Sequence, residues 1–347
     1  MVTIKDIASR SNFSSATVSR VLNNDEKLSV SFETRRRILD VAKELGYKTL
    51  QERKGEQINP KEKGPKVGIL LCQSVEEEMN DTYFLSIRRG VERECADLGF
   101  TATELFRLSN LSSEQISSDL ENLIVIGRIN TEILESFNTR LKNVVYINNI
   151  EADEGFDSVV IDFKNATRKA IQHLIDLGYK RLGYIGGMEA EHYSNNKIPI
   201  EDTRKKTFEM VMKEFGLYEE QNVMVGEFTM KSGYEQMNQH IKRGDVPEAF
   251  FVASDGLAIG AMRALQEANL KVPEDVAIVS FNDIEMAKFA STPLTTIKVY
   301  TEEMGRIGVK MMAERLNGRE LPLKVTVPTK LVLRDSCGAL GIKKATS

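Results

Sequence analysis

The sequence predicts an α/β protein in which a small all-α headpiece precedes a core of two doubly wound parallel α/β lobes. Three observations favour this class. Residues 3–48 carry apolar side chains at helical spacing. Residues 49–66 are polar and interrupted by Gly and Pro, which is typical of a linker. From residue 67 onward, short apolar runs alternate with longer helical stretches.

The headpiece should contain three short helices. Asn12 is expected in the turn between the first two, because Asn tolerates positive φ better than most residues. Ser14 is placed to cap the second helix, so the pair predicts a helix-turn-helix. The apolar faces at i, i+3, i+4 spacing are Ile4, Ile7 and Ala8; Val18, Val21 and Leu22; and Ile38, Val41, Ala42 and Leu45.

The core should be built from βαβ units covered on both faces. So many units exceed one compact sheet, which favours two interleaved lobes with a cleft beyond the carboxyl ends of their strands. We expect a helix-turn-helix domain over 1–48, a hinge over 49–66 and a two-lobed core over 67–347. Strands are expected at 67–71, 123–126, 144–147, 158–161, 182–185, 249–252 and 276–280, and helices at 83–98, 164–177, 202–215, 232–241, 256–268 and 301–316.

Charge is unevenly distributed along the 347 residues. The formal net charge is −4, yet residues 1–66 hold 14 Lys or Arg against 9 Asp or Glu. A basic N-terminal segment followed by an acidic remainder is expected when the N-terminal segment binds nucleic acid. An ordinary solvent-exposed basic surface has the same composition. Without a run of 18 apolar residues, an apolar leader or an even set of cysteines, the sequence favours a soluble cytoplasmic protein.

Enzymatic motifs are missing from the sequence. It has no Gly-x-Gly-x-x-Gly after a strand, no Walker A loop and no Gly-x-Ser-x-Gly elbow. His173, His192 and His240 have no metal-ligand spacing. We therefore expect a protein that is not an enzyme and that needs no cofactor and no metal.

The second helix has the composition of a DNA-reading helix. Small side chains at Ser15 and Ala16 let a helix enter the major groove, which is ~12 Å wide, and Arg20 can bind guanine with two hydrogen bonds. The alternative is a three-helix interaction module.

Motifs along nearly the whole chain resemble the lactose/galactose repressor (LacI/GalR) family. The N-terminal motifs are Thr3-Ile4-x-Asp6-Ile7-Ala8, Ser14-x-Ala16-Thr17-Val18-Ser19-Arg20-Val21-Leu22-Asn23, Val30-Ser31-x-x-Thr34-Arg35 and Leu45-Gly46-Tyr47. Core motifs include Asp157-x-Val159-Val160-Ile161-Asp162 and Phe251-Val252-Ala253-Ser254-Asp255. The resemblance implies a homodimeric repressor of double-stranded palindromic operator DNA, with a periplasmic-binding-protein-like core and no membrane contact.

Carried over by position, the resemblance makes Ser15, Ala16 and Arg20 the base-reading residues. The residues expected on phosphate are Thr3, Ser14, Thr17, Ser19, Asn23, Ser31, Thr34 and Arg53. The hinge departs from the family pattern. Where the family has a leucine that enters the minor groove, this chain has Glu56, preceded by the helix-weakening Gly55, which puts a kinked operator in doubt.

The resemblance also places a small sugar in the cleft between the lobes. The expected effector-binding residues are Asp81, Phe84, Asp162, Arg204, Phe228, Ser254, Asp255 and Asn282. Several have an ordinary alternative, since Asp162 and Asp255 can simply cap helices and Phe84 can pack in the core. Arg204 suits paired hydroxyls or a carboxylate, and Phe228 can stack on a sugar ring.

Two segments are most similar to galactose-operon and evolved β-galactosidase repressors within the family, namely residues 78–90 and Val279-Ser280-Phe281-Asn282-Asp283. This similarity points to galactose or a galactoside as the effector that releases the operator. A corepressor-dependent or phosphocarrier-assisted regulator remains open. So does a cytosolic sugar-binding protein without DNA function. The short polar segment 335–347 favours a dimer over a tethered tetramer.

Overall fold

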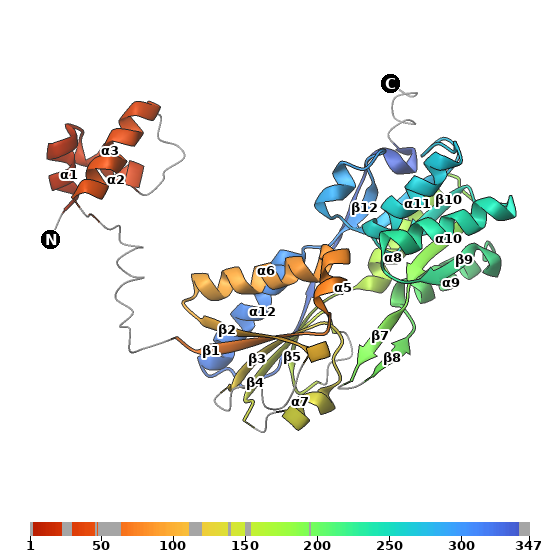
Figure 1. The fold of residues 1–347 in the computed structure, drawn as a ribbon, viewed down its shortest axis with the longest axis horizontal. Helices are drawn as coiled ribbons and strands as arrows, with labels where there is room; N and C mark the ends of the chain where they lie inside the picture. Colours follow the sequence, from red (N-terminus) through yellow and green to blue (C-terminus); the bar gives the residue numbers. More distant parts are fainter. Residues whose placement is uncertain are drawn as a thin grey trace. The chain divides into compact units, whose positions relative to one another are not determined.

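The computed structural model describes residues 3–22, 30–45, 47, 64–110, 120–137, 140–149, 154–193 and 196–339. The chain divides into two compact units, Met1–Gly64 and Pro65–Ser347 (Figure 1). Across the described residues, no helix is long and apolar enough to cross a membrane.

The N-terminal unit is a three-helix headpiece made of α1 (Ile4–Ser11), α2 (Ser15–Leu22) and α3 (Phe32–Glu44). Asn12 ends α1 in the left-handed conformation, with φ of 66°, as predicted. The apolar faces meet in one small cluster, and its buried members are Ile7, Ala8, Val18, Val21, Ile38 and Ala42. This packing leaves the opposite face of α2 to solvent.

The first lobe of the C-terminal unit is a six-stranded sheet in which every pair is parallel, with the order β13-β5-β4-β3-β1-β2. Its strands are β1 (Lys66–Leu71), β2 (Thr101–Arg107), β3 (Asn122–Ile126), β4 (Asn143–Ile147), β5 (Asp157–Ile161) and β13 (Lys324–Val327). The helices of this lobe are α5 (Val75–Asn80), α6 (Thr82–Asp97), α7 (Thr131–Phe137) and α12 (Thr301–Leu316), and a 3-10 turn, η1 (Leu108–Asn110), follows β2.

The second lobe has the sheet order β14-β12-β11-β10-β6-β9, and only β14 runs antiparallel. Its strands are β6 (Leu182–Gly187), β9 (Val223–Gly226), β10 (Ala249–Val252), β11 (Ala277–Asn282), β12 (Thr295–Lys298) and β14 (Lys330–Val332). Helices α8 (Phe163–Asp176), α9 (Thr203–Glu214), α10 (Met230–Arg243) and α11 (Asp255–Glu267) complete it, with 3-10 turns η2 (Glu220–Asn222), η3 (Glu285–Lys288) and η4 (Asp335–Cys337). A hairpin of β7 (Glu189–His192) and β8 (Lys197–Ile200) lies between β6 and α9.

The two lobes are interleaved, because the chain passes between them after β5, after β12 and after β13. The fold class expected from the sequence is therefore confirmed. Every strand and helix range expected in the core corresponds to an observed element. The structure adds elements that were not expected, chiefly β2, the short helices α5 and α7, and the β7–β8 hairpin.

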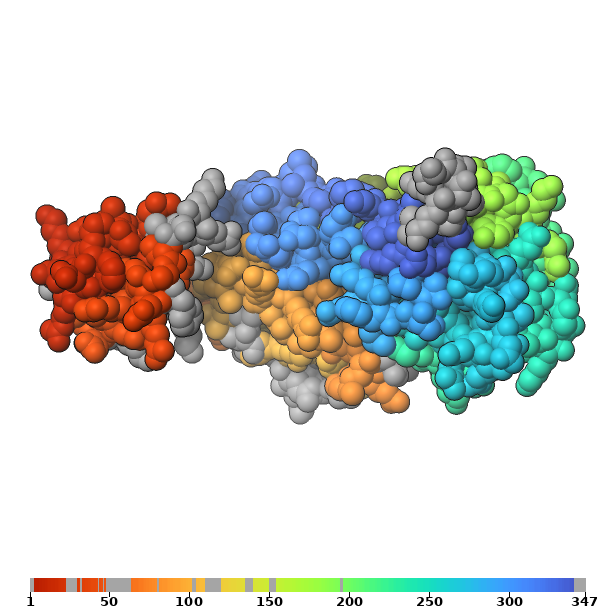
Figure 2. Space-filling view, turned by 90° about the horizontal axis from the view of Figure 1, so that it is seen from above, coloured from red at the N-terminus to blue at the C-terminus, as the bar shows by residue number. Residues whose placement is uncertain are grey.

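Helix α12 returns to the first lobe and packs closely on α6. Figure 2 shows its blue atoms against the orange atoms of α6, and the Thr301 hydroxyl donates to Ser86 at 2.8 Å across 215 residues of sequence. Glycines make the close approach possible: a Cβ on Gly90 would lie 2.0 Å from the Glu302 carbonyl oxygen, and one on Gly305 would lie 2.2 Å from that of Ile87. The contact between α6 and α12 therefore holds α12, which follows the second-lobe strand β12, in the first lobe.

We expect Gly90→Ala to lower the free energy of unfolding by about 1–3 kcal/mol, because the methyl group forces α6 and α12 apart. Gly256→Ala is the matched control. A Cβ there meets only the Ser254 hydroxyl, at 3.9 Å, and the substitution should be neutral or stabilise by about 0.4–1 kcal/mol. Urea titration followed by circular dichroism measures both, and equal midpoints for the two variants would contradict this account of the helix contact.

Candidate functional sites

The outer face of α2 is exposed in the headpiece. Ser15, Ala16 and Arg20 are solvent-exposed, whereas Val18 and Val21 on the same helix are buried in the cluster beneath. Small side chains followed by an arginine on a protruding helix are the arrangement that enters a major groove. The geometry is thus compatible with the base-reading role expected for these three residues, which stays a prediction.

Hydroxyl side chains cap all three headpiece helices. Thr3 forms a capping box with Asp6, and this hydrogen bonding lowers the pKa of Asp6. The Ser14 hydroxyl accepts from the backbone N–H of Thr17 at 3.1 Å, and Ser31 accepts from that of Thr34, also at 3.1 Å. Helix N-termini with capping hydroxyls attract phosphate, so the observed capping is compatible with the expected phosphate contacts, which stay a prediction.

Ser19 is half-buried on α2. Three other positions of the DNA prediction, Asn23, Arg53 and Glu56, lie outside the described residues, and so does Gly55.

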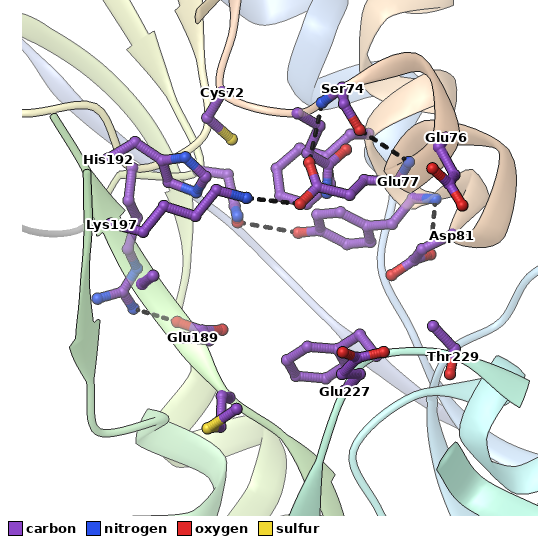
Figure 3. A pocket seen from close by; sticks show the side chains of 18 of the residues that line it. Cys72, Ser74, Glu76, Glu77, Asp81, Glu189, His192, Lys197, Glu227 and Thr229 are labelled. Carbon is purple, nitrogen blue, oxygen red and sulfur yellow. Dashed lines mark hydrogen bonds and ion pairs between the residues drawn. The ribbon is translucent and has the colours of Figure 1, made fainter. Parts of the chain in front are cut away.

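A cavity of about 490 Å³ lies between the two lobes of the core. Five of the eight expected effector residues line it, namely Asp81, Phe84, Arg204, Phe228 and Asn282. They come from both lobes, and Figure 3 shows side chains converging on the space from the two sides. A cavity of this size falls in the range of small-molecule sites, about 300–1,000 Å³.

Arg204 is the most heavily bonded of these residues. Its guanidinium donates to both oxygens of Asp202 at 2.6–3.0 Å, to Glu189 at 2.7 Å and to the Ala253 carbonyl at 3.0 Å. The ring of Phe228 stacks over it, with the centroid 4.9 Å away. The paired carboxylates raise the pKa of Arg204, and the whole group is 6% exposed. Its charge is therefore compensated before any ligand arrives.

Glu189 joins the two lobes through charge. It accepts from Arg204 of the second lobe and forms an ion pair at 3.1 Å with Arg128, which follows β3 of the first lobe. Burial and the neighbouring Asp202 raise the pKa of Glu189 despite both arginines. The cavity wall thus carries a continuous chain of charges, from Asp202 through Arg204 and Glu189 to Arg128.

Neutral polar groups occupy the remaining walls. Asn148, in the left-handed region with φ of 66°, accepts from the Tyr83 hydroxyl at 3.0 Å. Asn282, with φ of 112° at the end of β11, is buried, and its Oδ1 has no hydrogen-bond partner within the part of the chain that the structure describes. A buried acceptor without a partner is costly unless a ligand supplies the donor. Asn282 is therefore well placed to read a hydroxyl.

Three expected effector residues do not line the cavity. Asp162 caps α8, accepting from the Asn165 N–H at 2.8 Å, and Ser254 caps α11 through the Leu257 N–H. Asp255 is fully buried and accepts from the hydroxyls of Ser280 and Thr296 and from the Ile284 N–H; burial raises its pKa to about 7. They lie outside the cavity lining and bind helix N-termini or neighbouring hydroxyls instead, so we leave these three out of the proposed effector site.

Sequence reasoning missed several residues of the lining. Asn148 follows β4 directly and Arg128 lies two residues after β3, so the expectation of a cleft beyond the carboxyl ends of the strands could have pointed to both. Glu189, His192 and Lys197 belong to the unexpected hairpin. In the described part of the chain, no group of three or more His, Cys, Asp or Glu side chains is arranged to hold a metal.

Comparison with known proteins identifies the family. Residues 3–49 match the family described as bacterial regulatory proteins, lacI family, and residues 171–337 match a periplasmic binding protein-like domain. The chain is 50% identical over 342 residues to the HTH-type transcriptional repressor MelR of Bacillus subtilis, covering 97% of this chain and 98% of that protein. The chain belongs to the lacI family.

Other relatives agree with this assignment. The HTH-type transcriptional regulator GalR of Streptococcus thermophilus is 36% identical over 341 residues, covering 97% of this chain and 99% of GalR. The lac repressor dimer bound to operator and the anti-inducer ONPF has the same fold, with a TM-score of 0.67 at 22% identity over 97% of this chain and 99% of that one. The predicted family is confirmed, and the lacI-family protein belongs among transcriptional regulators rather than enzymes.

We expect Arg204→Ala to lower the free energy of unfolding of this lacI-family protein by about 3–5 kcal/mol, because it leaves Asp202 buried without its partner. The control, Arg168→Ala, removes an ion pair with Glu214 in which the side chains are 40% and 44% exposed, respectively. It should change the free energy of unfolding by at most about 1 kcal/mol. Urea titration at neutral pH compares them. Similar losses in both variants would mean that the buried charge chain does not hold the cleft together.

Proposed function

We propose that this lacI-family protein represses a sugar-utilisation operon as a homodimer bound to palindromic operator DNA, and that galactose or a galactoside releases it. The observation that carries the proposal is the cavity between the lobes. It combines hydroxyl-reading groups at Asn148 and Asn282 with aromatic faces at Phe84 and Phe228. Sugars need both kinds of surface, since their hydroxyls form hydrogen bonds and one side of the ring is apolar.

The charges of the cavity favour an uncharged ligand. Two of the basic groups, Arg204 and Arg128, are already paired with carboxylates, and Lys197 is paired with Glu77 at 2.6 Å. An anion such as a phosphorylated sugar would therefore meet excess negative charge. The lining holds five carboxylates, from Glu76, Glu77, Asp81, Glu189 and Glu227, against the three basic side chains Arg128, Lys197 and Arg204.

Relatives support the same reading. GalR of Streptococcus thermophilus and GalR of Lacticaseibacillus casei, 36% and 34% identical, support the choice of galactose or a galactoside. The regulator CelR, with a TM-score of 0.67, was solved as a cellobiose complex, and the lac repressor was solved on its operator. A sugar in the cleft and DNA at the headpiece are therefore the two ligands to test.

The mechanism follows from the lobe connections. Because three chain segments join the lobes, a ligand held by both favours one lobe arrangement over another, and in a dimer this changes the spacing of the two headpieces. Palindromic half-sites about one helical turn apart accept only one spacing. The shift cannot exceed the difference in sugar affinity between the two states, typically about 1–3 kcal/mol.

The decisive experiment is fluorescence anisotropy of the purified protein on DNA from upstream of its own operon. Salt is held constant, because phosphate contacts make affinity steeply salt-dependent. We expect tight specific binding that galactose or lactose weakens. Binding that a sugar strengthens would indicate a corepressor, and binding that needs a second protein would indicate a phosphocarrier-assisted regulator. Absence of specific binding would contradict the DNA function.

We expect Arg20→Ala to weaken operator binding by about 1–3 kcal/mol and to relax discrimination at one base pair, because the bidentate contact with guanine is lost. Arg36→Ala is the control: this arginine is 74% exposed on α3 rather than on the reading helix α2, and the substitution should leave the ranking of operator variants unchanged. Titration of single-base operator variants measures both. An unchanged specificity profile for Arg20→Ala would reject the base-reading role.

A further inference from the structure

The β7–β8 hairpin belongs to the second lobe by sequence but is hydrogen-bonded to the first. The His192 N–H donates to the Arg128 carbonyl at 2.9 Å, and the His192 carbonyl accepts from the Asn130 N–H at 3.0 Å. Side chains add to this: the Asn130 amide donates to Glu191 at 3.1 Å, and Lys197 pairs with Glu77 of α5 at 2.6 Å. The hairpin therefore spans the cleft, and His192 is the residue at which the two lobes join through backbone hydrogen bonds.

The side chain of the same residue lines the cavity. Figure 3 shows His192 beside Lys197, Cys72 and Glu77, on the other side of the view from Glu227 and Thr229. Neither ring nitrogen has a hydrogen-bond partner among the residues that the structure describes. Burial, helped by Lys197, lowers the pKa of His192 to about 4, so the ring is neutral at physiological pH. A neutral imidazole offers one N–H donor and one acceptor nitrogen.

His240 shows what a purely structural histidine looks like in this protein. It is almost fully buried in α10, its ring packs edge-on against Phe250 with centroids 5.1 Å apart, and it lies outside the cavity. Its pKa is also lowered to about 4 by burial. What distinguishes His192 is its position, since its ring faces space large enough for a ligand while its backbone bridges the lobes.

We propose that His192 is a specificity-determining residue of the effector site, where its neutral ring donates to one hydroxyl of an uncharged glycoside and accepts from another. The proposal rests on the sugar-binding function proposed above. Hydroxyl groups are the fitting partner, because each can both donate and accept a hydrogen bond. Because His192 also makes the backbone bridge to Arg128 and Asn130, a sugar held by its ring stabilises the bridged arrangement of the lobes directly.

The test uses three variants of the full-length protein. His192→Phe keeps an aromatic ring and removes both polar atoms, whereas His192→Gln keeps one donor and one acceptor. Ile198→Thr is the matched control, because Ile198 lies on the same hairpin, is 45% exposed and is absent from the cavity lining. Isothermal titration calorimetry with galactose and with lactose gives the affinities, and anisotropy gives operator binding without sugar.

We expect His192→Phe to weaken binding of the preferred sugar about tenfold or more, as two lost hydrogen bonds imply, and to change the galactose-to-lactose affinity ratio. His192→Gln should recover most of the affinity, and Ile198→Thr should match the wild type both in sugar affinity and in sugar-free operator binding. An equal loss for both sugars that glutamine does not recover would show a merely structural role and overturn the proposal.

Failure of this inference is distinguishable from failure of the proposed function. If the wild type binds a sugar and His192→Phe binds it equally well, the His192 ring makes no contribution to sugar affinity. That result contradicts the role of His192 and leaves the proposed function intact. If the wild-type protein binds neither galactose nor lactose, the galactoside assignment falls first, and the role of His192 falls with it.

Discussion

Burial of the Arg204 guanidinium is the constraint on which the effector cleft depends. A charge that is 6% exposed is tolerated only when it is paired and its N–H groups are satisfied. Asp202, Glu189 and the Ala253 carbonyl meet that demand, and they come from the start of α9, the start of β7 and the end of β10. The Arg204 side chain therefore connects three elements of the second lobe beside the cavity.

The same constraint reaches the first lobe. Because Glu189 is shared between Arg204 and Arg128, movement of one lobe relative to the other separates a partly buried ion pair. The backbone bridge at His192 and the pair of Lys197 with Glu77 act in parallel at the other end of the hairpin. A ligand that favours one lobe arrangement thus acts on a small number of identifiable contacts rather than on the whole interface.

The fold could be predicted from the sequence because the hydrophobic pattern of each helix and inner strand is contained within its own residues. Runs such as Leu123–Ile126 are buried on both sides of a parallel sheet and are therefore continuously apolar. The β7–β8 hairpin could not be found in this way. Its strands have only four residues each, and its position is set by hydrogen bonds to Arg128 and Asn130, far away in the sequence.

The candidate site was predictable to the extent that strand ends face the cleft. The resemblance pointed to Asn282 and Phe228, which line the cavity, but it pointed equally to Asp162, Ser254 and Asp255, which do not. At those three positions the first turn of a helix or a neighbouring hydroxyl satisfies the side chain, and sequence alone does not reveal which competitor wins. Arg204 lines the cavity as expected, but its guanidinium N–H groups are bonded to carboxylates. We therefore expect a ligand to contact Phe228, which stacks on Arg204, rather than the guanidinium itself.

The headpiece separates stability from recognition more completely than the cleft does. Val18 and Val21 hold α2 to the cluster, whereas Ser15, Ala16 and Arg20 on its other face are exposed. Substitution at exposed positions away from caps and packing contacts usually changes stability by less than about 0.5 kcal/mol. If these three residues read bases as predicted, operator preference can change at them while the fold is kept. In the cleft, Arg204 lines the cavity and is also buried among its carboxylate partners, so substitution there changes the stability of the lobe together with the cavity wall.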